Sequence, residues 1–188
     1  MNQEEVIIQI LWRSYVCFNG VINPSRRSNA LLYTKEGTLN LIECDDVKYV
    51  YFIEEYDKKT IGETFIYNDG SINIVINYDV LLDTLYSVEE NDRESFCVYV
   101  ILHELHHCQQ DIDLKYFSNE ELAKRIEYQN DVNTYRFMYN YSEYIKNRIG
   151  IPRFNPGVVR YRADINLKDI DMLRDDEFNY IQNNPIQF

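Results

Sequence analysis

The first stretch of the chain has the apolar spacing of a helix. Between Glu4 and Phe18, apolar side chains recur at every third or fourth position, which predicts an amphipathic helix. Residues 21–29 contain the pair Asn23-Pro24 among small polar side chains, and this composition predicts a loop. We therefore expect one helix to end before any strand begins.

Short runs of β-branched and aromatic residues follow, over roughly residues 37–78. Their composition and their alternation of apolar and polar positions predict strands. Asn68-Asp69-Gly70 separates the last two runs, and such a turn sequence is typical of a β-hairpin. We expect a small, mostly antiparallel sheet made of the segments GTLNLIEC, VKYVYFIEEY, GETFIYN and SINIVINY, followed by a short helix at LLDTLYSV.

Two longer helices are predicted in the second half of the chain. Phe96–Leu102 is an almost unbroken apolar run, which indicates a helix that is buried on most sides. A longer helix follows it, and Gly150 with Pro152 marks its end. Together these patterns predict an α+β fold in one domain, residues 1–188, with a core at about 37–150 and a C-terminal tail at 151–188.

Composition and charge narrow the function classes. The chain has 188 residues, 45% hydrophobic and 27% charged, with a net charge of −12. A negative field repels phosphate, so we expect no nucleic-acid partner. The N-terminal residues lack a basic stretch, and no apolar run approaches the ~18 residues that a membrane helix needs. We therefore expect a cytoplasmic protein with no membrane partner.

All three histidines lie in one short segment, His103-Glu104-Leu105-His106-His107. Residues four apart on a helix lie about 40° apart around the axis and one turn along it, so His103 and His107 can bind one ion. Glu104 falls on the adjacent side, within reach of a water beside that ion. His106 projects to the other side, so we expect it to support the site or face solvent.

A third ligand is needed to complete such a site, and no other histidine exists in the chain. It must then be a carboxylate or a thiolate. Glu127 and Asp131 lie four residues apart on the later helix, twenty and more residues after His107. Glu127 can close the site, and Asp131 can accept a hydrogen bond from the second nitrogen of a histidine ligand and fix its tautomer.

These two helices resemble the gluzincin metallopeptidases, in which an apolar helix carries HExxH and a later helix carries ExxxD. VILHELHHCQQD is most similar to the thermolysin-like enzymes, through Val100, Leu105, Cys108 and Asp111. The segment EYQNDVNTY is also similar to that of minimal gluzincins and of ImmA/IrrE-type peptidases. The resemblance covers roughly Gly62 to Gly150.

The resemblance implies a zincin-like fold and a peptidase that uses one Zn²⁺ ion per chain. It implies that Glu104 is the general base and that Asp131 supports a ligand; the implied ligands are His103, His107 and Glu127. It also implies that the strand at Ser71–Tyr78 is the edge of the sheet, where a peptide or protein substrate binds by adding a strand.

The chain departs from the thermolysin-like pattern because it has no further histidine to stabilise an oxyanion. A tyrosine or arginine must then take that role, and the sequence offers Tyr135, Arg153, Arg160, Tyr161 and Arg162. Two alternatives to a zinc endopeptidase stay open: a zinc-binding regulator or inhibitor with little or no turnover, and a metal-free acidic interaction protein.

Overall fold

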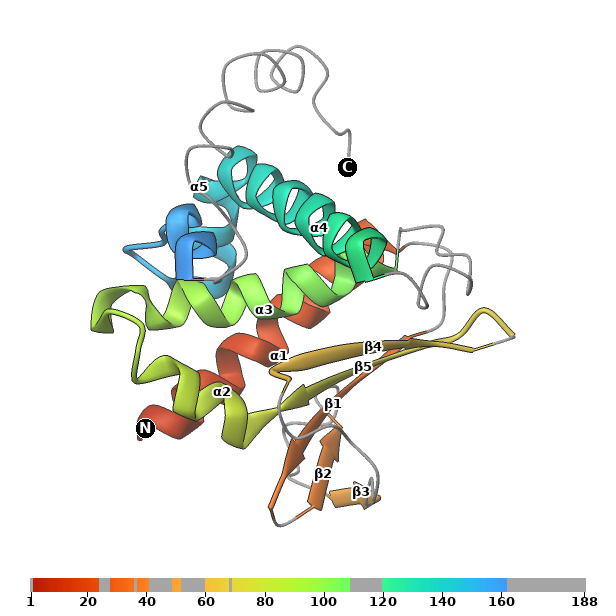
Figure 1. Cartoon of the computed structure of the whole chain (residues 1–188). Helices are drawn as coiled ribbons and strands as arrows, with labels where there is room; N and C mark the ends of the chain where they lie inside the picture. The colour runs from red at the N-terminus through yellow and green to blue at the C-terminus, as the bar shows by residue number, and fades with distance from the viewer. Residues whose placement is uncertain are drawn as a thin grey trace.

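The computed structural model describes residues 2–23, 28–35, 37–40, 49–51, 60–67, 69–108 and 120–161. Its elements form the expected α+β fold, in which a mixed sheet packs against helices (Figure 1). The helix α3 lies at the centre, where it contacts the first helix α1, the strand β4 and the long helix α4. No described helix is long and apolar enough to cross a membrane.

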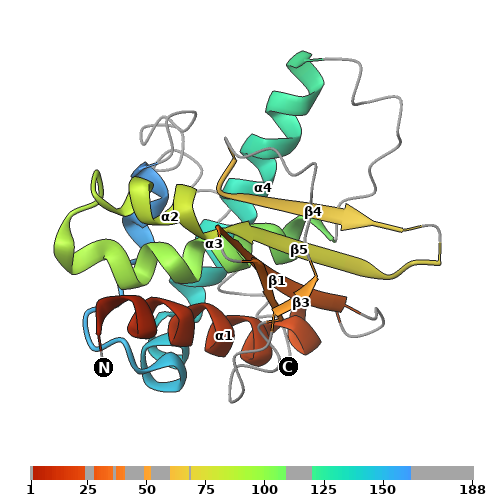
Figure 2. The same cartoon turned by 90° about the horizontal axis from the view of Figure 1, so that it is seen from below.

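The predicted N-terminal helix is confirmed as α1, Gln3–Ile22, which is longer at both ends than expected. Asn2 caps it: its side chain accepts from the backbone N–H of Glu5 at 2.8 Å, and the Glu5 carboxylate accepts in return from the backbone N–H of Asn2 at 3.0 Å. Six apolar residues of α1 are buried: Ile7, Ile10, Leu11, Tyr15, Phe18 and Ile22. The helix lies along α3 (Figure 2). The helix α1 thus supports α3 from one side.

The sheet contains five described strands in the order β3-β2-β1-β5-β4. Their bounds are β1 Ser28–Thr34, β2 Gly37–Asn40, β3 Tyr49–Tyr51, β4 Gly62–Ile66 and β5 Ile72–Asn77. Three pairs are antiparallel and only β1 with β5 is parallel, so the prediction of a mostly antiparallel sheet is confirmed. The central strand β1 was not expected, because its apolar run Ala30-Leu31-Leu32 is too short to show a period.

The hairpin predicted from Asp69 and Gly70 joins β4 to β5. The Tyr67 N–H donates to the Ser71 carbonyl at 2.9 Å, and Gly70 has a φ of 82°, which glycine adopts without strain. The expectation that Ser71–Tyr78 is an edge strand is wrong. Strand β5 pairs with β1 on one side and β4 on the other, and Tyr78 already belongs to a helix.

The observed helices differ from expectation mainly at their ends. The short helix begins earlier than the expected LLDTLYSV. The long helix ends at Asn140, and two short helical pieces continue it. The last piece stops at Gly150, as predicted, and Gly150 has a φ of 85°. The bounds are α2 Tyr78–Leu85, η2 Glu90–Asp92, α3 Arg93–His107, α4 Glu120–Asn140, α5 Ser142–Ile145, η4 Lys146–Gly150 and η5 Pro156–Tyr161. The possible helix near LKDIDMLRDDEF lies outside the described residues.

One main core joins elements from both ends of the described chain. It includes Ile7 and Phe18 of α1, the sheet face that carries Ile74, and Val158 and Val159 of η5. The core is therefore wider than the expected range of about 37–150. Helix α3 is central to it, and each residue from Ser95 to His106 is buried.

Candidate metal centre

Helix α3 presents two imidazole nitrogens to one point. His103 Nε2 and His107 Nε2 lie 3.0 Å apart, as expected for side chains one helical turn apart. His103 is buried, whereas the side chain of His107 keeps some contact with solvent. The apolar sequence of α3 fixes this geometry, because burial on most sides holds the helix and its histidines in place.

Helix α4 brings Glu127 to the same point. Its two carboxylate oxygens lie 3.2 Å from His103 Nε2 and 2.9 Å from His107 Nε2. The three residues offer ligand atoms that all lie within 4.8 Å of one another. Atoms bound to zinc at about 2.0–2.1 Å in a tetrahedron lie roughly 3.3 Å apart, so this nitrogen and oxygen set fits such an ion.

Asp131, one turn after Glu127, holds the far side of His103. His103 Nδ1 donates to Asp131 Oδ1 at 2.6 Å, and this bond leaves Nε2 to face the cluster. Burial alone would lower the pKa of His103, but the hydrogen bonds with Asp131 and Glu127 outweigh it and raise the pKa to about 9. Burial would raise the pKa of Glu127, but its hydrogen bonds with His103 and His107 bring that pKa below its usual range.

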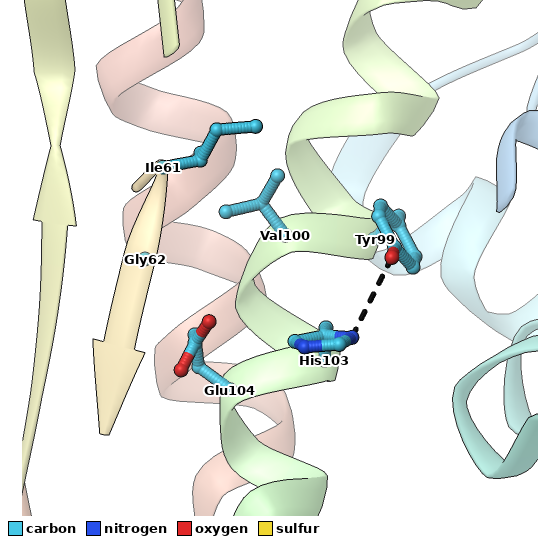
Figure 3. Close-up of a pocket in the computed structure, with 6 residues that line it drawn as sticks. All are labelled: Ile61, Gly62, Tyr99, Val100, His103 and Glu104. Atoms are coloured by element: carbon cyan, nitrogen blue, oxygen red, sulfur yellow. Dashed lines mark hydrogen bonds between the residues drawn. The ribbon is translucent and has the colours of Figure 1, made fainter. Parts of the chain in front are cut away.

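Tyr99 completes this side of the site, and sequence reasoning missed it. Its hydroxyl donates to Asp131 Oδ1 at 2.5 Å and lies 3.5 Å from His103 Nδ1 (Figure 3). Tyr99 sits one turn before His103 on α3, so the helical spacing from His103 was the available signal. The hydroxyl and the imidazole therefore share one carboxylate oxygen.

Glu104 points toward strand β4 (Figure 3). The Thr64 hydroxyl donates to Glu104 Oε2 at 2.6 Å and also lies 3.1 Å from the Glu104 carbonyl oxygen. A Cβ at Gly62 would lie 2.6 Å from Glu104 Oε1, so only glycine lets the strand approach this closely. Thr64 and Gly62 were not predicted, because a contact between a strand and a helix that are distant in the chain leaves no local pattern in the sequence.

A small pocket opens beside Glu104 and His103, between β4 and α3. It is lined by Ile61, Gly62, Tyr99, Val100, His103 and Glu104 (Figure 3). The pocket thus combines the expected base, one ligand candidate and two aliphatic side chains. It can admit a water or a small group next to both Glu104 and His103.

His106 is not a ligand candidate, as expected, but it does not face solvent. It is buried, and its Nδ1 donates to the Leu102 carbonyl at 2.6 Å. Its ring packs edge-on against Phe137 at 5.4 Å between centroids. Burial lowers the pKa of His106 to about 4, so this ring is neutral at pH 7.

Three of the expected oxyanion donors, Arg153, Arg160 and Tyr161, form hydrogen bonds near the start of α3. Arg160 and Tyr161 both donate to Asp92, at 2.9 and 2.8 Å. Asp92 precedes His103 by eleven residues, about 16 Å along a helix. Arg153 donates to Asn91, Tyr135 packs near Tyr139, and Arg162 lies outside the described residues.

Comparisons with known protein families, curated proteins and solved structures found no match. The function must therefore be inferred from the geometry of the site. Three candidate ligands converge on one point, a buried carboxylate stands beside them, and a described edge strand passes over that carboxylate.

Proposed function

We propose that this protein is a zinc-dependent endopeptidase of the gluzincin type. The observation that carries the proposal is the convergence of His103, His107 and Glu127, together with the position of Glu104, which lines one small pocket with His103. A purely structural zinc site is closed by four protein ligands, whereas the described residues offer three here and a neighbouring base. Such an arrangement favours hydrolysis over simple metal storage.

The three converging side chains would hold the ion, one per chain. A bound zinc ion would supply Lewis acidity, which lowers the pKa of a water and polarises a carbonyl. Asp131 keeps the proton of His103 on Nδ1, so that Nε2 presents its lone pair to the cluster. Glu127 contributes a negative charge that partly neutralises the cation.

Glu104 would act as the general base and then as the acid. It takes the proton of the attacking water and passes it to the leaving amine of the peptide. Its carboxylate is buried and fixed by Thr64, so little reorganisation is needed to reach one defined position.

The peptide substrate would bind along β4 and not along Ser71–Tyr78. In the described sheet, β4 is the edge strand that contacts α3. An extended peptide that adds to this edge passes over Glu104, because Gly62 and Thr64 both touch that side chain. Main-chain pairing would bring the scissile carbonyl close to the base.

The second candidate is a zinc-binding regulator or inhibitor with little turnover. It is favoured by the engagement of Arg160 and Tyr161 with Asp92, far along α3 from the cluster. An enzyme without a donor for the developing oxyanion loses roughly 10²–10³ in turnover. Metal content does not separate the two candidates, but peptide cleavage does.

Elemental analysis of protein purified without chelators is the first test. We expect about one zinc per chain in the wild type and a large loss in Glu127→Ala. A peptide-library cleavage assay follows, with Glu104→Gln as the blank, since glutamine keeps an oxygen for Thr64 but cannot take a proton. Zinc with no cleavage would favour the regulator, and no zinc after reconstitution would refute both candidates.

A further inference from the structure

Two buried asparagines hold the backbone of α3 next to the ligand candidates. Asn130 of α4 donates through its Nδ2 to the His103 carbonyl at 2.8 Å. Asn23, which caps the end of α1, donates through its Nδ2 to the Leu105 carbonyl at 3.2 Å. Both carbonyls belong to the last turns of α3, which carry the candidate histidine ligands. Neither asparagine is itself a ligand candidate or the expected base.

The two asparagines differ in the helix to which they belong. Asn130 lies three residues after Glu127 and one before Asp131, and this spacing places the three side chains on one face of α4. Asn23 ends α1, and none of the three candidate ligands comes from that helix. The two amides thus make the same kind of hydrogen bond, but Asn130 alone of the pair joins the two helices that supply the ligand candidates.

The bond from Asn130 holds the main chain of α3. Glu127 and Asp131 reach the ring of His103, at 3.2 and 2.6 Å, and such contacts restrain the backbone only through the rotatable bonds of the side chain. Asn130 reaches the carbonyl of the same residue. In an α-helix that carbonyl also accepts from the N–H four residues on, which here belongs to His107. The amide therefore fixes the turn that joins the two histidines against α4.

An amide is an unfavourable choice at this position if it only fills space. Asn130 is fully buried, and no described group donates to its Oδ1. A buried polar atom without a hydrogen bond destabilises the folded state, and an apolar side chain of similar shape avoids that loss. The bond from Nδ2 to the His103 carbonyl is thus the contact that an apolar residue could not replace.

We infer that Asn130 is a positioning residue for the metal centre: by tying α4 to the backbone of α3, it places the Glu127 carboxylate where it completes the three-ligand site. Glu127 depends most on such a tie, because it comes from a different helix than the histidines and its side chain is 39% exposed. Without the amide, α4 can shift along α3, and water would replace the carboxylate on part of the bound ions. The inference rests on the metal-binding part of the proposed function and not on peptide hydrolysis.

The test compares two matched variants, Asn130→Leu and Asn23→Leu. Leucine has the same branching and the same number of heavy atoms as asparagine, but it cannot donate a hydrogen bond. Asn130→Ala is a second variant at the first position, in case leucine does not fit there. The probe is cobalt(II), which takes the same nitrogen and oxygen ligands as zinc and whose visible absorption reports its coordination number. Cobalt affinity is measured by titration and unfolding by urea.

We expect both Asn130 variants to bind cobalt roughly tenfold more weakly than the wild type, as when an outer partner of a metal ligand is lost. Their visible absorption per bound cobalt should also fall, because cobalt with more water ligands and a higher coordination number absorbs more weakly. Asn23→Leu also loses a buried hydrogen bond, so its urea midpoint should fall to a similar extent. Its cobalt affinity and spectrum should stay those of the wild type.

Three outcomes would overturn the inference. Wild-type cobalt affinity and spectrum in both Asn130 variants would do so and leave the proposed function standing. Equal weakening by Asn23→Leu would do the same, because the effect would then follow from lost stability and not from the position of Glu127. A wild-type protein that binds neither cobalt nor zinc after reconstitution would overturn the inference and the proposed function together.

Discussion

At the scale of single residues, buried hydrogen bonds decide which atoms of the histidines are available. His103 donates to Asp131, and His106 donates to the Leu102 carbonyl, so the Nδ1 of each ring is already engaged. His103 therefore offers Nε2 to the cluster, while His106 stays neutral and buried among apolar groups. His103 thus faces the candidate metal centre, whereas His106, three residues later on the same helix, bonds and packs within the core.

Tyr99→Phe tests whether the shared oxygen of Asp131 matters for metal binding. The change removes the hydroxyl bond of 2.5 Å but keeps the ring, and loss of such a supporting partner costs roughly 10-fold or more in metal affinity. Zinc affinity by chelator competition should fall accordingly. The control is Tyr15→Phe, which removes another buried hydroxyl bond, to Ser28, and should lower stability without changing zinc affinity. Equal zinc affinities in all three proteins would contradict the prediction.

His106→Asn tests the neutral buried ring through the pH dependence of stability. The folded pKa of about 4 lies below the unfolded value of 6.5, so the unfolded chain binds the proton first and stability falls as pH drops from 6.5 toward 4. The difference between the folded and unfolded pKa values of His106 corresponds to about 3 kcal/mol of unfolding free energy at most. Asparagine can still donate to Leu102 but cannot titrate. Urea unfolding of metal-free protein should therefore be less pH-dependent in the variant; parallel pH curves would refute this.

At the scale of elements, the contact between β4 and α3 sets the position of the base. The strand supplies no Cβ at residue 62 and one hydroxyl at Thr64, and both meet Glu104. The strand that would bind a peptide therefore also holds the carboxylate. A shift of this strand would displace substrate and base together.

Gly62→Ala tests this contact directly. The added Cβ would lie 2.6 Å from Glu104 Oε1, so the carboxylate or the strand must move. A displacement of about 1 Å can cost on the order of 100-fold in turnover, while zinc content should stay near one per chain. Gly20→Ala is the control: nothing lies within 4 Å of its Cβ, and it should stabilise α1 by roughly 0.5–1 kcal/mol. Unchanged cleavage by Gly62→Ala would contradict the role of the contact.

At the scale of the whole molecule, α3 connects the two ends of the described chain. Its start is tied to η5 by Asp92, which accepts hydrogen bonds from Asn155, Arg160 and Tyr161. Its length packs on α1, and its end carries the ligand candidates. Residues 151–161 therefore contribute to the core and are not merely a tail.

Asp92→Ala tests this connection. The change removes one acceptor from Asn155, Arg160 and Tyr161, while Arg160 keeps its ion pair with Glu89, and we expect it to cost about 2 kcal/mol of unfolding free energy. Urea denaturation should show the loss, with zinc content unchanged because the cluster lies near the other end of α3. Asp83→Ala on the exposed side of α2 is the control and should change stability by less than about 0.5 kcal/mol. Equal midpoints for both variants would refute the prediction.

The sequence alone determined the features that depend on local spacing. The helical period located α1, and the almost unbroken apolar run located α3. Asp69-Gly70 located the hairpin, and the four-residue intervals placed His103 with His107 and Glu127 with Asp131. Helix geometry fixes such intervals whatever surrounds them. The same spacing separated His106 from the ligand candidates.

Only the tertiary structure decided which strand is the edge and what touches Glu104. Strand order depends on pairing between distant segments, and this pairing made β5 an interior strand and β4 an edge of the described sheet. The hydroxyl of Tyr99 bonds Asp131 on another helix. On strand β4, the hydroxyl of Thr64 bonds Glu104 of α3, and Gly62 leaves room for the same side chain. Such contacts have no period in the sequence, because they arise only when separate elements meet.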